Sequence, residues 1–180
     1  MALLIGLVVA LLVGGVQGDS CGVSSCAALQ IKYANTVTFN NVCNSTNSCN
    51  NTAPFDNIFI VDGSLSINSD IFYTTMLDFL EAAFCSFGGQ SGKNRFGVVI
   101  FGGQVRVAVP LAFYTEYDWF CQIEGMRSNP TTCCSCCTPS AEAFDLTRTE
   151  FINHGLYLPG DTLRIRNAII VSDGNPWQVS

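Results

Sequence analysis

The chain has 180 residues, which is enough for one domain with a hydrophobic core, and its hydrophobic content of 48% is typical of a globular protein. It carries 14 acidic and 8 basic residues, for a net charge of −6, without a run of like charges. This balance argues against a nucleic-acid-binding protein, which would present a basic face. It predicts a generally acidic surface.

The first 18 residues, "MALLIGLVVALLVGGVQG", are predicted to be a secretory signal peptide. Their apolar part, residues 2–16, is too short to span a bilayer comfortably, and small residues follow it near a plausible cleavage site. A membrane anchor made from the same stretch is the alternative. We expect no membrane span in the rest of the chain.

The ten cysteines are expected to form disulfide bonds, because their number is even and a secreted chain is oxidised. Asn44 and Asn50 each begin an N-glycosylation sequon, which is consistent with a surface loop of a secreted protein. We therefore expect a secreted, extracellular protein.

The remaining chain is predicted to alternate strands with helices, after a Cys/Asn-rich segment at 19–54 that contains one short strand at 36–39. The strands are expected at 58–61, 96–101, 105–109 and 168–171. The helices are expected at 69–87, 116–126 and 140–154. The first and last of these four strands are continuously apolar, as in a parallel sheet buried on both faces, whereas Gly102-Gly103 indicates a hairpin. The pattern predicts an α/β sandwich around a mostly parallel sheet.

Helix 69–87 shows a helical apolar stripe, with Asp78 and Glu81 off the stripe. The stripe consists of Phe72, Met76, Phe79, Ala83 and Phe87. We expect these side chains to pack on the sheet.

A candidate cation site follows the first apolar strand. Asp62, Ser64 and Ser66 alternate along the chain, so an extended turn would aim their three oxygens at one point. Asp173 also follows a strand, and in open α/β sheets ligands bind beyond the carboxyl ends of the strands. Such oxygen donors suit a hard divalent cation. The alternative is an Asp/Ser turn that only caps the helix starting near Ser69.

Four stretches resemble, in order, the von Willebrand factor type A domain, which integrin I domains share. "IFIVDGSLSI" resembles the first strand and its D-x-S-x-S loop, and "RFGVVIFGGQVRVAVPL" the second and third strands. "CCTPSAEAF" is similar to the loop that carries the family's threonine, and "AIIVSDG" to the fourth strand with the last aspartate of the metal-ion-dependent adhesion site. The resemblance implies a three-layer Rossmann-like sandwich with one antiparallel edge strand.

The resemblance also implies a function. Its five metal-site positions are filled by Asp62, Ser64, Ser66, Thr138 and Asp173. They would hold Mg²⁺ or Mn²⁺, and the open coordination position would take a carboxylate from a protein ligand of the matrix or a cell surface. An extracellular adhesion domain is therefore expected.

Two features depart from the family pattern. Cys133 to Cys137, "CCSCC", replace the glycines that usually precede the threonine. We expect disulfides there, with Cys85 and Cys121 as candidate partners; a zinc site is the alternative. The sequence also stops soon after the fourth expected strand, so we expect a type A domain at 55–180 that is incomplete at its C-terminus, with further domains possible in a longer parent chain.

Two other functions compete with this expectation. A hydrolase built on the serines and the single histidine, His154, lacks the G-x-S-x-G elbow, so no enzymatic activity is expected. A structural extracellular-matrix or Cys-rich scaffold module, which uses the fold without metal-dependent binding, remains the main alternative.

Overall fold

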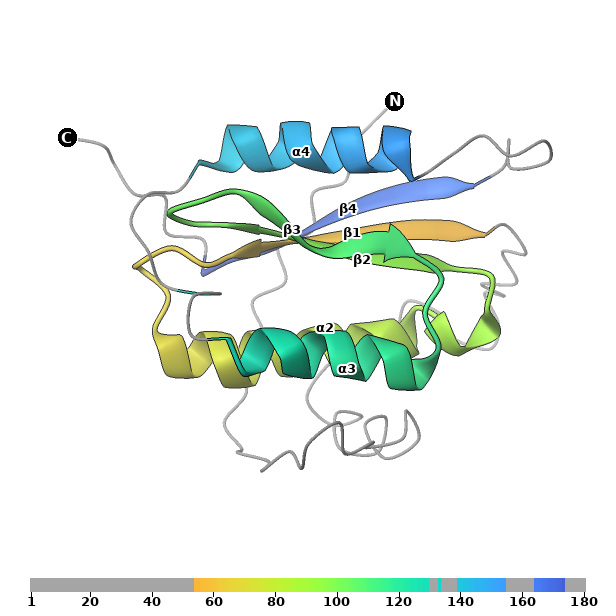
Figure 1. Ribbon diagram of the computed structural model, residues 1–180, viewed down its shortest axis with the longest axis horizontal. Coiled ribbons are helices and arrows are strands. Elements are labelled where there is room, and N and C mark those ends of the chain that lie inside the picture. Colours follow the sequence, from red (N-terminus) through yellow and green to blue (C-terminus); the bar gives the residue numbers. More distant parts are fainter. Residues whose placement is uncertain (1–53, 130–132, 134–138, 155–163, 174–180) are drawn as a thin grey trace, which may run out of the picture.

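The protein folds as a sheet with helices on both faces (Figure 1). The computed structural model describes residues 54–129, 133, 139–154 and 164–173. The strands are β1 (Phe55–Asp62), β2 (Arg95–Phe101), β3 (Arg106–Ala112) and β4 (Ile165–Val171). The helices are η2 (Ile71–Met76, a π-helix), α2 (Leu77–Ser86), η3 (Gly89–Ser91, a 3₁₀-helix), α3 (Glu116–Arg127) and α4 (Ser140–Asn153).

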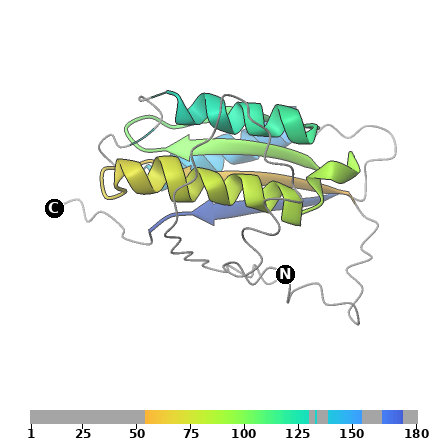
Figure 2. The same cartoon turned by 90° about the horizontal axis from the view of Figure 1, so that it is seen from below.

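The strand order is β3-β2-β1-β4, and β1 pairs in parallel with both β2 and β4. Strand β3 is antiparallel to β2, as the hairpin at Gly102-Gly103 predicts. Helices α2 and α3 cover one face and α4 the other, which gives three layers; the view from below shows β4 at one side of the sheet (Figures 1 and 2). The predicted fold class, a mostly parallel α/β sandwich with one antiparallel edge strand, is confirmed for these residues.

The four strands predicted after residue 54 are present, but β1 and β4 begin three residues before the expected positions; the strand predicted at 36–39 lies outside the described residues. Four of the six added residues are polar, and one contact between the neighbouring strands joins two of them: Asn167 Nδ2 donates to Asn57 Oδ1 over 2.9 Å. Strand β3 continues past Pro110, which lies exposed on an edge strand where a missing N–H costs little. Hydrophobicity alone therefore underestimated the length of the strands.

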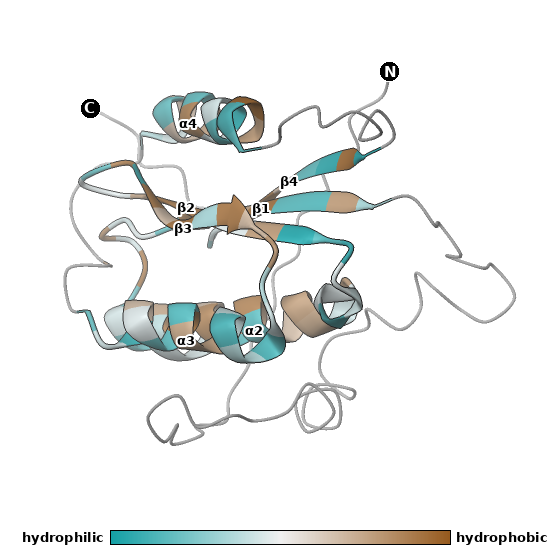
Figure 3. Cartoon of the chain, turned by 45° about the vertical axis from the view of Figure 1, so that its right-hand side comes forward, coloured by the Kyte–Doolittle hydropathy of each residue, from teal (hydrophilic) through white to brown (hydrophobic). Residues whose placement is uncertain are grey.

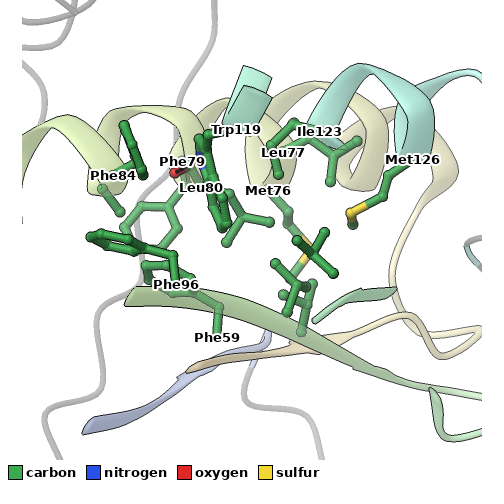
Figure 4. Packing of buried hydrophobic residues seen from close by; sticks show 14 of the residues in the cluster. Phe59, Met76, Leu77, Phe79, Leu80, Phe84, Phe96, Trp119, Ile123 and Met126 are labelled. Carbon is green, nitrogen blue, oxygen red and sulfur yellow. Dashed lines mark hydrogen bonds between the residues drawn. The ribbon is translucent and has the colours of Figure 1, made fainter. Parts of the chain in front are cut away.

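The main core lies between the sheet and the α2/α3 face (Figure 4). Trp119 of α3 stacks on Phe84 of α2 with ring centroids 5.3 Å apart, and its indole N–H donates to the carbonyl of Leu80 over 3.2 Å. The predicted stripe of helix 69–87 is buried here, apart from the half-buried Phe87. Each large side chain removed from water adds roughly 1.5–3 kcal/mol, so this core contributes strongly to the stability of the fold.

The opposite face has a smaller core beneath α4. Ile58 and Ile60 of β1 contribute to it, and Ala143 of α4 is fully buried against them. Figure 3 shows that α4 carries many hydrophilic residues, consistent with a helix of which only one side is buried. Glu150 links α4 to the edge strand β3, because its Oε1 accepts a hydrogen bond from the backbone N–H of Leu111 over 2.8 Å.

Several predictions concern residues outside the described part of the chain. They include the signal peptide, almost all of segment 19–54 and most of the cysteine cluster, and they stay predictions. Cys85, Cys121 and Cys133 are each disulfide-bonded. Within the described ranges, no helix has the length and apolar character needed to cross a membrane.

A buried ion cluster joins the amino-terminal ends of the parallel strands. Asp56 of β1 is fully buried, and its two carboxylate oxygens accept from Arg95 Nε over 2.7 Å and Arg95 Nη2 over 2.6 Å. Arg164, which precedes β4, donates from Nε to the same carboxylate over 2.7 Å. Both guanidinium groups lie over the ring of Phe113, at 5.7 and 5.3 Å from its centroid.

Replacing Asp56 by asparagine is expected to destabilise the protein by about 3–5 kcal/mol, since two buried guanidinium groups would lose the carboxylate that they share. Urea denaturation measures the change. The control is Asp145→Asn, whose carboxylate is 81% exposed and lies 3.9 Å from Arg148; there we expect little change. Equal stability of the two variants would contradict the role given to Asp56.

A second ion cluster links α2 to α3. Glu81, which lies off the predicted stripe, is buried. Arg127 Nη2 lies 3.4 Å from Glu81 Oε1 and 3.0 Å from Asp78 Oδ1, and Arg127 Nε lies 2.7 Å from Glu124 Oε1. Burial, opposed by Arg127 and reinforced by the other two carboxylates, raises the pKa of Glu81 from 4.5 to about 7.

Because folding raises this pKa, the folded state binds a proton that the unfolded state has lost. The stabilisation is therefore complete below about pH 4.5 and disappears as the pH rises through 7. Glu81→Gln is expected to be more stable than the parent at pH 8, by on the order of 3 kcal/mol, and similar to it at pH 4. Urea denaturation at both pH values tests this, and an unchanged pH profile would refute it.

Candidate metal centre

The candidate site lies where β1 ends. Because β1 and β4 are parallel neighbours, their carboxyl ends meet at one edge of the sheet, with Val61 opposite Val171. The first loop, which runs from Asp62 at the end of β1 to Asn68, is yellow in Figure 1. It leaves this edge and leads to the helical segment that contains η2 and α2. The predicted first-loop residues and the end of β4 are thus brought to the same edge.

Backbone and side-chain hydrogen bonds hold the first loop. Gly63 N–H donates to the carbonyl of Phe101, at the end of β2, over 2.6 Å. Ser64 N–H donates to Asp62 Oδ1 over 2.9 Å, and the hydroxyl oxygens of Ser64 and Ser66 lie 2.9 Å apart. The Asp62 carboxylate is thus linked to the backbone of Ser64, and the Ser64 side chain to that of Ser66, while the convergence of the three oxygens on one cation stays a prediction.

Burial separates the loop into inner and outer residues. Asp62 and Ser64 are each only 1% exposed, and Ile67 is anchored in the main core. Leu65, between the two serines, is 57% exposed. The side chains of Asp62 and Ser64 are therefore withdrawn from solvent, Ser66 is half-buried, and Leu65 faces solvent.

The capping role proposed as the alternative is filled by another residue. Helical structure begins at Ser69, and Asn68 Oδ1 accepts the backbone N–H of Asp70 over 2.7 Å. The carbonyl of Asn68 accepts the first helical hydrogen bond, from Phe72 N–H, over 3.0 Å. Asn68 is thus the N-cap, and the described hydrogen bonds of the Asp62 carboxylate and the two serine hydroxyls cap no helix.

The other two predicted ligands lie differently. Asp173 is exposed, two residues past the end of β4. Its neighbour Ser172 reaches the first loop: Ser172 Oγ donates to Asp62 Oδ2 over 2.8 Å. Thr138 lies outside the described residues, so its place in the site stays a prediction.

Sequence reasoning missed Ser172 and Gly102. Gly102 follows β2 directly beneath the first loop, and a Cβ added to it would lie 2.6 Å from the carbonyl oxygen of Gly63. Ser172 could have been identified from the predicted parallel strands only if their register had also been known. Gly102 was explained by the predicted hairpin, so its close approach to Gly63 was not considered.

The donors fit a hard divalent cation better than a soft one. Asp62, Ser64 and Ser66 offer only oxygen, and Asp173 adds a second carboxylate at the same edge. No cluster of three or more His, Cys, Asp or Glu side chains suited to a metal occurs in the described ranges, so serine hydroxyls are needed to complete a ligand set. Neutral hydroxyls would leave a bound cation with most of its charge, and hence able to attract a further anion.

Gly102→Ala is expected to displace the first loop, because the added methyl group meets rigid backbone, and to destabilise the protein by about 1–3 kcal/mol. Gly125→Ala is the matched control: it adds the same atom within α3, where nothing lies within 4 Å. That variant should gain stability, by about 0.5–1 kcal/mol. Urea denaturation compares them, and a Gly102→Ala protein as stable as the parent would contradict the close approach.

Comparison with known proteins gives one match. Residues 56–128 match the model of the von Willebrand factor type A domain, over less than half of the chain. No curated protein matches the chain. The matched region contains β1, the first loop and α3, and the strand order and layers are those that the resemblance implies. The match supports a von Willebrand factor type A domain in this part of the chain, residues 56–128.

Proposed function

We propose that this protein is a secreted adhesion domain that binds an acidic group of a protein ligand through Mg²⁺ or Mn²⁺. A type A domain marks the chain as an adhesion or protein-interaction module of a commonly extracellular class. The proposed ligand set is Asp62, Ser64, Ser66, Thr138 and Asp173. The predicted signal peptide and the ten cysteines support secretion.

One observation carries the metal proposal: Asp62 and Ser64 are buried at a sheet edge, connected to Ser66, and not used as a helix cap. Burying a carboxylate is costly unless its charge is compensated. The described partners of Asp62 are a backbone N–H and a hydroxyl, which are both neutral. A divalent cation would supply the missing positive charge.

A bound cation would supply Lewis acidity toward one carboxylate of the ligand. The protein's own residues would fix where that carboxylate binds. The first loop is held by β2 through Gly63, and exposed Leu65 lies beside the site, where it would contact apolar groups of the ligand. The proposed role is binding without catalysis.

Titration with Mn²⁺ or Mg²⁺ is expected to raise the melting temperature of the full chain, expressed in an oxidising system. At a concentration one hundred times Kd, the stabilisation is about 2.7 kcal/mol, or a rise on the order of 5 °C. Asp62→Ala should abolish the rise, whereas Asp145→Ala, at an exposed carboxylate on α4, should retain it.

The carboxylate part of the proposal has its own measurement. Bound Mn²⁺ enhances the relaxation of water protons, and acetate should lower the enhancement if a carboxylate replaces metal-bound water. A chain that no divalent cation stabilises, with Asp62→Ala melting like the parent, would favour the structural scaffold module instead.

A further inference from the structure

We propose that Ser172 is a positioning residue of the cation site, acting on Asp62 rather than on the metal. This inference rests on the proposed function. Ser172 Oγ donates to Asp62 Oδ2 over 2.8 Å, and no resemblance assigns Ser172 a role.

The sheet register explains why Ser172 reaches Asp62. Val61 of β1 pairs with Val171 of β4. The residues that follow them, Asp62 and Ser172, therefore lie opposite one another. Side chains opposite each other on adjacent strands point to the same face of a sheet. The contact is therefore built by strand pairing, not by a loop that happens to fold over the site.

The Asp62 carboxylate is held from two sides. Its Oδ1 accepts the N–H of Ser64, within the same loop, while its Oδ2 accepts the hydroxyl of Ser172, from another strand. The terminal torsion of an aspartate is soft, so one donor alone leaves the carboxylate free to rotate about that bond. Two donors on separate chain segments fix its plane and hence the directions of its remaining lone pairs.

Ser172 and Asp173 would then have different tasks. Ser172 is half-buried and neutral, so it orients Asp62 without weakening its attraction for a cation. Asp173 is exposed and contributes a negative charge. Preorganised partners of ligating side chains commonly affect metal affinity as much as tenfold or more.

The test compares Ser172→Thr with Ser172→Val in the full chain. These side chains have nearly the same shape, and only threonine keeps the hydroxyl. The dissociation constant of Mn²⁺ is measured from the electron paramagnetic resonance signal of the free ion. Urea denaturation without metal reports how well each variant folds.

We expect Ser172→Thr to bind Mn²⁺ within about twofold of the parent, and Ser172→Val to bind roughly tenfold more weakly while remaining folded. Equal affinity of the two variants would overturn the positioning role and leave the proposed function intact. A parent chain that does not bind Mn²⁺ would overturn both. If Ser172→Val does not fold, Ser172→Ala replaces it, and parental affinity of that variant would likewise overturn the inference.

Discussion

The register of β1 between its two parallel neighbours is the constraint on which the rest of the structure depends. β1 is buried along almost its whole length, and it pairs with β2 on one side and β4 on the other. Both helical layers pack on it or on the strands beside it. A carboxylate stands near each end, Asp56 at the start and Asp62 at the finish, about 20 Å apart along an extended strand.

These two buried aspartates differ in the charges around them. Asp56 faces two guanidinium groups, so its charge is more than balanced and it joins three chain segments. Asp62 is met by an N–H and a hydroxyl, which orient it but leave its charge uncompensated among its described partners. The same residue type thus stabilises the sheet at one end and offers an anionic binding position at the other. Environment, rather than residue type, separates the two roles.

The sequence was sufficient for features that depend on local patterns, and insufficient for those that depend on register. Local patterns predicted all four described strands, and the spacing of Asp62, Ser64 and Ser66 singled out a loop whose residues are hydrogen-bonded to one another. The burial of Glu81 was not predicted, because an amphipathic stripe cannot reveal that Arg127 of another helix packs beside it. Ser172 was missed because its contact depends on which residue of β4 stands opposite Asp62.

The geometry of the first loop therefore depends on contacts at the far end of the sheet. β1 supplies the carboxylate, the end of β2 supplies a backbone acceptor, and Ser172 after β4 supplies a hydroxyl.

A slip of β4 by one residue would turn Ser172 to the opposite face and break its contact with Asp62. Hydrophobic packing resists such a slip on the covered face, but Ala168 and Ile170 of β4 are exposed on the other. The ion pair between Asp56 and Arg164 adds a directional contact that favours the observed register. The buried ion cluster thus helps to set the position of the candidate metal centre from the opposite end of β1.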